Sequence, residues 1–234
     1  MKSSLFVTLL AGGLAALDAT PVAQTLASQP LVTATILGAV WGDWSTALAV
    51  GIVLQILAAS TLPIGARTPE DYAVGGVVGA GVALIIAAQA PFEQVRQAAA
   101  FTGVMVGLLA ATVGDPIVRW QRRRNEGLAR WTEAAIRAGD ERALGRAHVA
   151  AISMAFAIGL AATALWCGLG MALAPVVSRH SLRLAGVWQM AQPLWLGFGV
   201  AQLLNAFVQR RLSRAGVFAI TLVAAWLVFV AGTP

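Results

Sequence analysis

The chain is poor in charge. Only 11% of its 234 residues are Asp, Glu, Lys or Arg, whereas a soluble domain has about 25%. Hydrophobic residues make up 59% and the mean hydropathy is +0.78. This composition excludes an ordinary soluble domain and predicts a polytopic membrane protein. The length fits a single membrane-embedded domain over residues 1–234.

Cysteine and histidine are also scarce. The single Cys167 excludes an intramolecular disulfide and a cysteine metal cluster. His148 and His180 have neither ligand spacing nor a phosphoacceptor setting. The sequence has no Ser/His or paired-Asp motif with usable spacing, so we predict no catalytic residue, no metal site and no cofactor. Glycine-rich runs at 75–81 and 168–170 lack a Walker lysine, and we interpret them as close helix packing.

The net charge of +6 comes mainly from one segment. Half of the 16 Lys and Arg residues lie between positions 119 and 147. The positive-inside rule puts this segment in the cytoplasm, and it lacks the groove-reading pattern of a nucleic-acid-binding protein. We expect an Arg-rich helical loop at about 119–147, made of short helices punctuated by Gly127, Gly139 and Gly145, against lipid or a partner.

The apolar segments predict an all-α transmembrane bundle. Two of them are too short to cross a bilayer, which takes about 20 residues. Leu31–Trp41 follows Pro30, and Ala185–Gln192 ends at Pro193. We predict that both are re-entrant or half-membrane helices, one in each of two pseudo-repeated halves. The other segments are Leu5–Leu17, Ala47–Leu62, Tyr72–Ala90, Ala98–Val118, Ala147–Leu173, Leu194–Val208 and Gly216–Val230.

Counting spans gives a topology. Leu5–Leu17 is predicted to be a retained first span, because Asp18–Pro21 is a poor signal cleavage site. If Leu31–Trp41 does not cross, four spans precede the Arg-rich segment. The parity then puts Lys2 and the Arg-rich segment on the same, cytoplasmic side.

Polar residues inside apolar sequence point to a substrate site. A carboxylate near the bilayer centre costs roughly 2.5–3.5 kcal/mol, so such groups usually face a cavity, a partner or a substrate path. Carboxamides both donate and accept hydrogen bonds, as sugar hydroxyls do. The predicted substrate-binding residues are Asp18, Gln24, Gln29, Asp43, Gln55, Arg67, Gln189 and Gln192.

Several of these residues also have a structural interpretation. Asp18 either contacts substrate or caps the next turn, and Asp43 has the position of a helix N-cap. Arg67 either anchors the chain at the interface or meets a phosphoryl group. Gln189 and Gln192 either contribute to the substrate site from the second half of the chain or form hydrogen bonds between helices.

Three motifs together resemble the mannose/sorbose-type IIC membrane component of the bacterial phosphotransferase system. They are Gln24-Thr-Leu-Ala-Ser-Gln-Pro-Leu-Val, Leu37-Gly with Gly42-Asp43 and Gly51-Ile-Val-Leu-Gln55, and Leu62-Pro-Ile-Gly-Ala-Arg-Thr-Pro-Glu-Asp71. The resemblance covers Leu14 to Gly79 most specifically. Gln29 stands where that family usually has Arg, and Gln55 where many members have Glu.

The resemblance implies a sugar translocation subunit in the bacterial cytoplasmic membrane. Such a subunit passes a hexose or related sugar inward for phosphorylation by a IIB subunit. It also implies IIA and IIB phosphocarriers and a IID membrane subunit, assembled as a trimer of IIC–IID pairs. Two alternatives remain open at this point: a substrate-binding subunit of another importer, with an ATPase partner, or a non-transporting regulatory scaffold.

Overall fold

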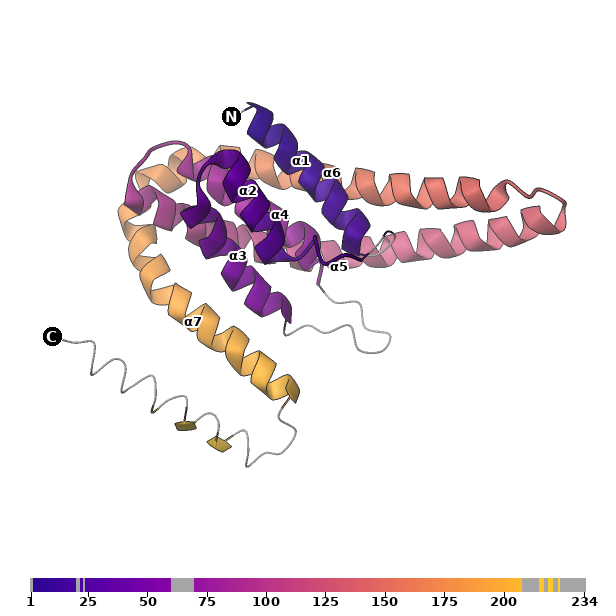
Figure 1. Ribbon diagram of the computed structural model, residues 1–234. Coiled ribbons are helices and arrows are strands. Elements are labelled where there is room, and N and C mark those ends of the chain that lie inside the picture. Colours follow the sequence, from indigo (N-terminus) through magenta and orange to yellow (C-terminus); the bar gives the residue numbers. More distant parts are fainter. Residues whose placement is uncertain are drawn as a thin grey trace.

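The computed structural model describes residues 2–19, 22, 24–59, 70–207, 215–216, 219–220 and 223. Within these ranges the chain is all helical, as predicted. The helices are α1 (Lys2–Ala19), α2 (Pro30–Trp41), α3 (Trp44–Ala59), α4 (Tyr72–Ala87), α5 (Glu93–Arg137), α6 (Ala143–Arg179) and α7 (Ser181–Phe207). They form a bundle from which α5 and α6 project as a pair (Figure 1).

Helix α4 lies at the centre of the bundle. All of its residues from Val74 to Ala87 are buried, and it packs against α1, α2, α3, α5 and α6. Glycines allow α4 and α5 to approach until their backbones touch. A Cβ added at Gly103 would lie 2.6 Å from the Gly79 carbonyl oxygen, and one at Gly107 would lie 2.9 Å from that of Gly75. The predicted close packing of the 75–81 run is therefore confirmed.

Helices α2 and α3 form a short hairpin. Pro30 occupies the first turn of α2, where its missing N–H costs nothing. Gly42, at φ +72°, ends α2 in the left-handed conformation, and Asp43 then caps α3. The 12 residues of α2 extend about 18 Å, less than the hydrocarbon core of a bilayer. The prediction of a short helix at Leu31–Trp41 is confirmed.

The Arg-rich segment is not a set of short helices, so that prediction is wrong. Helix α5 continues through Gly127 for 45 residues, about 67 Å, and the chain turns only before α6, with Gly139 at φ +91°. One glycine costs roughly 1 kcal/mol in a helix, which the surrounding helix formers and ion pairs offset. The ion pairs join Arg119 to Asp115 and Arg137 to Glu133.

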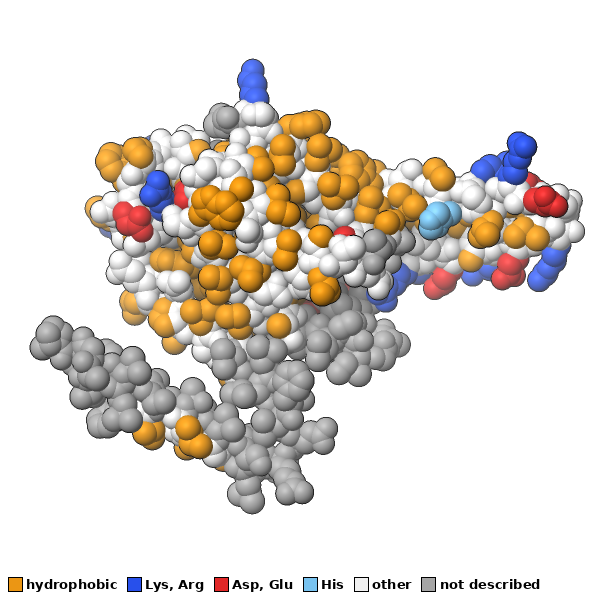
Figure 2. All heavy atoms as spheres, viewed as in Figure 1, with side chains coloured by type: hydrophobic (Ala, Val, Ile, Leu, Met, Phe, Trp, Pro, Cys, Tyr) orange, Lys and Arg blue, Asp and Glu red, His pale blue; other side chains and the backbone are white. Residues whose placement is uncertain are grey.

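We call the projecting ends of α5 and α6, residues 119–147, the arm. Charged side chains gather on it, whereas the visible face of the body is mainly hydrophobic (Figure 2). Two arginines cover tryptophan rings there. The Arg124 guanidinium carbon lies 5.2 Å from the Trp120 ring centroid, and that of Arg146 lies 5.5 Å from Trp131.

The prediction that Ala185–Gln192 is a half-membrane helix that ends at Pro193 is also wrong. Helix α7 runs without interruption from Ser181 to Phe207 with Pro193 inside it. Proline is tolerated in membrane helices because neighbouring helices and local adjustments satisfy the freed carbonyl groups. The prediction that the two halves are pseudo-repeated stays a prediction. Most of the predicted Gly216–Val230 span lies outside the described residues.

The predicted topology needs correction, because Lys2 and the arm lie at opposite ends of the bundle (Figure 1). Helix α1 runs antiparallel to α6: Gly81 lies beside both Thr8 and Cys167, while Gly12 meets Gly159. The physical reason is the α2–α3 hairpin. The prediction counted only one of its two helices as a pass along the bundle. In the structure α2 runs away from the arm end and α3 returns to it, so the number of passes before the arm is odd.

Among the described residues, three helices are long and apolar enough to cross a membrane. They are α1, α5 and α6, and the shorter apolar helices are α2, α3 and α4. A multi-pass membrane protein is therefore supported for the part of the chain that the structure describes.

We predict that Gly103→Ala destabilises the bundle by about 1–3 kcal/mol, because the new methyl group forces α4 and α5 apart. The measurement is the thermal unfolding midpoint of the purified protein in detergent. Gly168→Ala is the matched control, since a Cβ at Gly168 meets nothing within 4 Å. Equal midpoints for the two variants would contradict the close packing of these helices.

Candidate substrate site

The segment from Gln24 to Gln29, which we call the loop after α1, holds the Asp18 carboxylate. Its Oδ1 accepts hydrogen bonds from the backbone N–H and the hydroxyl of Thr25, both at 2.7 Å. Its Oδ2 accepts from the Ser28 backbone N–H at 2.9 Å. The structure thus shows that Asp18 caps this turn, one of its two predicted roles. These hydrogen bonds satisfy backbone N–H groups of the segment that follows the helix.

The same loop holds two side chains in an uncommon backbone conformation. Gln24 has φ +51° and Leu26 has φ +67°, and they are the only non-glycine residues with positive φ in the described ranges. Such strain costs roughly 1–3 kcal/mol per residue, and it persists only where the surrounding structure enforces it. Here the Asp18 hydrogen bonds enforce it, and Gln24 is left facing a cavity.

A pair of carboxamides joins the two ends of the α2–α3 hairpin. The Gln55 Nε2 donates a hydrogen bond to Gln29 Oε1 at 2.8 Å. The Leu31 backbone N–H donates to Gln55 Oε1 at 3.2 Å, which satisfies an N–H in the first turn of α2. Both amides are half-buried. The structure therefore brings Gln29 and Gln55 together.

The loop and the Gln29 end of this pair border a cavity of about 410 Å³ at the end of the body next to the arm. Its polar lining includes Asp18, Gln24, Ser28 and Gln29, and its apolar lining includes residues of all six helices from α1 to α6. On the arm side, Gln121 and Arg122 of α5 complete the rim. Pockets of roughly 300–1,000 Å³ that are largely apolar with a few convergent polar groups are typical ligand sites.

Glu70 is a cavity residue that sequence reasoning missed. Its Oε2 atom is buried but has no hydrogen-bond partner among the described residues. The neighbouring Asp71 has a structural role, because its carboxylate accepts from the Val74 N–H at 3.2 Å and its own N–H donates to the Ala111 carbonyl at 3.0 Å. The sequence feature that could have indicated Glu70 is the Glu-Asp pair just before α4. A helix N-cap needs only one carboxylate, so the second is available for another role.

Other predicted site residues lie elsewhere. Asp43 is at the opposite end of α2, where it caps α3 through the Thr46 N–H at 3.1 Å. Gln189 donates to Gln97 Oε1 at 3.1 Å near the start of α5, roughly 25 Å along that helix from Gly114 of the cavity. Gln192 is half-buried on α7 and does not line this cavity. Arg67 lies outside the described residues.

We predict that Asp18→Asn loosens the loop. An amide keeps only one acceptor oxygen, so the Thr25 and Ser28 donors cannot all be satisfied, at a cost of about 1–3 kcal/mol. Limited proteolysis should cut faster within residues 24–29. Glu133→Gln, on the exposed arm, is the charge-matched control and should leave the cleavage rate unchanged. A loop equally protected in both variants would argue against the capping role.

Comparisons with known proteins agree with this architecture. The family described as the sorbose-specific IIC component of the phosphotransferase system matches residues 3–230. No curated protein matches the chain. A solved "Structure of membrane protein" has 16% identity and a TM-score of 0.65, covering 97% of this chain and 96% of that one.

A second solved structure, of the mannose transporter ManYZ in complex with microcin E492 (MceA), has 15% identity and a TM-score of 0.55. The alignment covers 97% of this chain and 95% of that one. At these identities, both structures indicate a shared fold alone. The family match covers nearly the whole chain, and it shows that the protein belongs to the sorbose-type IIC components, the non-catalytic sugar-permease subunits of the phosphotransferase system.

Proposed function

We propose that the 410 Å³ cavity binds a hexose or related sugar and delivers it inward for phosphorylation by a IIB subunit. The observation that carries this proposal is the Gln29–Gln55 carboxamide pair, together with a Glu70 carboxylate oxygen that has no partner in the described part of the chain. An amide offers donors and acceptors, and a carboxylate accepts from hydroxyl groups. Together they match the alternating donor and acceptor demands of a neutral polyol.

Apolar walls complete the match. Tyr72 and Trp166 line the cavity, and aromatic rings offer faces against which the C–H groups of a sugar ring pack.

The polar residues then divide into two roles. Asp18 acts mainly through the loop, because its oxygens already accept three hydrogen bonds. Gln24 is presented to the cavity by that loop, and Gln55 holds the Gln29 amide at the cavity wall. We therefore assign direct contacts to Gln24, Gln29 and Glu70, and positioning roles to Asp18 and Gln55.

The position of the cavity suits inward release. The arm carries eight of the Arg residues, and the positive-inside rule places such a segment in the cytoplasm. The cavity lies at the arm end, with Gln121 and Arg122 on its rim. A sugar there is within reach of a cytoplasmic phosphocarrier. Lys2, at the other end of the bundle, is then outside.

The partners follow from the family. We propose a IID membrane subunit, IIA and IIB phosphocarriers and a trimer of IIC–IID pairs in a bacterial cytoplasmic membrane. Exposed apolar side chains on α6 and α7 support contacts with lipid or another membrane subunit. They include Leu165, Leu182, Met190 and Leu194, each more than 70% exposed.

We predict that Gln29→Ala and Glu70→Gln weaken sugar binding roughly 5–30-fold, because each removes hydrogen bonds worth about 1–2 kcal/mol. The measurement is equilibrium binding of radiolabelled mannose and sorbose to the complex purified from its native membranes. Gln94→Ala is the control, since Gln94 is exposed and does not line this cavity. Unchanged binding in both variants, or no saturable binding by the unaltered complex, would refute the proposed site.

The proposed sidedness gives a second prediction. Ala138→Cys, at the exposed end of α5 in the turn of the arm, should react with an impermeant maleimide only in inside-out vesicles. A cysteine replacing Ser3 should react only in right-side-out vesicles. Cys167 is buried and provides the background signal. Labelling of both positions from the same side would contradict the arrangement.

A further inference from the structure

A second cavity of about 270 Å³ lies at the end of the body away from the arm. It is lined by the α2–α3 turn, the end of α4 and the start of α5. The lining residues that form the site are Trp41, Asp43, Gln89 and Arg96. We propose that this cavity is an outer binding site for a neutral sugar-sized polyol, which it holds before transfer to the inner cavity. This inference rests on the proposed function of that inner cavity.

The centre of this outer site is a loose ion pair. Arg96 Nε lies 3.6 Å from Asp43 Oδ2, too far for a good hydrogen bond, and the two side chains are 41% and 17% exposed. Such partly exposed pairs contribute only about 0–1 kcal/mol to stability. The Asp43–Arg96 ion pair therefore contributes little to the stability of the fold. A ligand hydroxyl group can accept a hydrogen bond from the Arg96 guanidinium, whereas Asp43 mainly positions Arg96.

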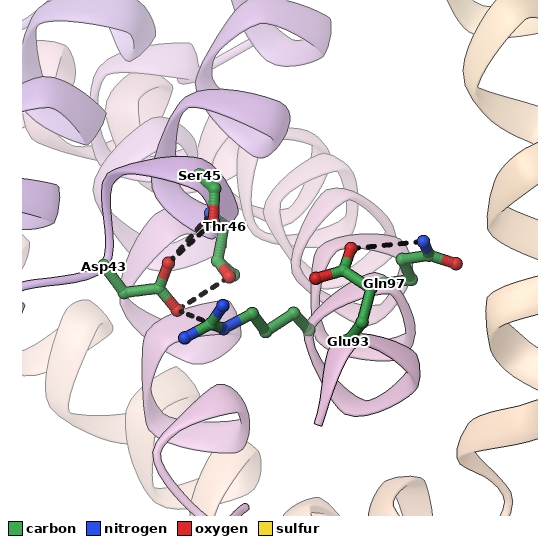
Figure 3. Close-up of polar contacts among 6 residues, drawn as sticks. Asp43, Ser45, Thr46, Glu93 and Gln97 are labelled. Carbon is green, nitrogen blue, oxygen red and sulfur yellow. Dashed lines mark hydrogen bonds and ion pairs between the residues drawn. The ribbon is translucent and has the colours of Figure 1, made fainter. Parts of the chain in front are cut away.

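Asp43 is fixed in place independently of Arg96. Its Oδ1 accepts from the Ser45 hydroxyl at 3.0 Å and the Thr46 N–H at 3.1 Å, and its Oδ2 accepts from the Thr46 hydroxyl at 2.8 Å (Figure 3). The N-cap thus holds the carboxylate at the edge of the cavity. Arg96 supplies guanidinium N–H donors in a planar fork.

An aromatic ring provides the apolar side of this site. The Trp41 indole N–H donates to the Thr8 hydroxyl at 3.0 Å, which fixes the orientation of the ring. Trp41 is only partly buried and lines the cavity, where it can pack against the C–H face of a sugar. The exposed Gln89 carboxamide adds a donor and an acceptor.

The charges favour a neutral ligand over an anion. The charges of Asp43 and Arg96 cancel, so the lining has no net charge to attract a carboxylate or phosphate. The volume is close to the lower end of the usual ligand range of about 300–1,000 Å³, which suits a single sugar ring.

Both sites belong to the same hairpin. Asp43 lies in its turn, whereas Gln29 and Gln55 lie at its open end, one length of α2 or about 18 Å away. Between them, Ala34 and Leu37 of α2 are fully buried, so the two cavities are separated by packed side chains. A solute can thus occupy the outer site while the inner site stays closed to that side.

The test uses right-side-out vesicles that contain the complete transporter and measures uptake of radiolabelled mannose and sorbose. We expect Arg96→Gln to raise the half-saturating concentration about tenfold, and Gln89→Ala to raise it about threefold. The maximal rate and the binding measured in inside-out vesicles should not change. Arg183→Gln is the control, because Arg183 is exposed on α7 and lies outside the cavity lining.

The outcomes separate this inference from the proposed function. If Arg96→Gln and Gln89→Ala both match Arg183→Gln while Gln29→Ala loses binding, the outer site is wrong and the inner site stands. If no sugar binds the unaltered complex, the proposed function is wrong, and the outer site, which rests on it, is wrong as well. Stronger competition from external mannose 6-phosphate than from mannose would show an anion site, which would also overturn the inference. Gln89→Ala removes no hydrogen bond that the structure shows, so it remains informative should Arg96→Gln fold poorly.

Discussion

The contact between α4 and α5 is the constraint on which the rest of the structure depends. Gly75 and Gly79 face Gly103 and Gly107, so that the two backbones touch and α4 is enclosed on all sides. Because lipid tails are as apolar as leucine, such close packing, and not hydrophobic burial, holds membrane helices together. The contact also fixes where α4 begins and ends. Its first turn forms the wall of the inner cavity, and its last turn forms the wall of the outer one.

Polar side chains in this bundle satisfy backbone groups before they can serve a ligand. Asp18 holds the loop after α1, Gln55 completes the first turn of α2, and Asp43 and Asp71 cap α3 and α4. Each short helix therefore brings its own cap into the membrane region, where water is scarce. Glu70 differs, because its buried Oε2 has no such partner among the described residues. That difference is the strongest structural argument for assigning it a ligand.

The sequence revealed local breaks better than it revealed which ends meet. Pro30 and Gly42 predicted the limits of α2, and the glycine run predicted a close helix contact, because these features act through the backbone nearby. Gly127 and Pro193 were misread, since a single glycine or proline does not end a helix whose neighbours and packing support it. The grouping of Asp43 and Gln189 with Gln24 also failed. Only tertiary packing places Asp43 at the far end of the α2–α3 hairpin and Gln189 beside Gln97 of α5.

If the inner cavity binds sugar as proposed, the charges around it give a physical reason for one-way release. A neutral sugar would meet the Gln24 and Gln29 amides and the Glu70 carboxylate, and a few net hydrogen bonds of about 1 kcal/mol each would give weak, reversible binding in the millimolar range. Phosphorylation adds roughly two negative charges, which Asp18 and Glu70 then repel at close range. Arg122 lies on the arm side of the same cavity, so under this proposal attraction to it would draw the product away from the carboxylates and toward the proposed phosphocarrier side. A site of this kind would favour the sugar before phosphoryl transfer and disfavour the sugar phosphate afterwards.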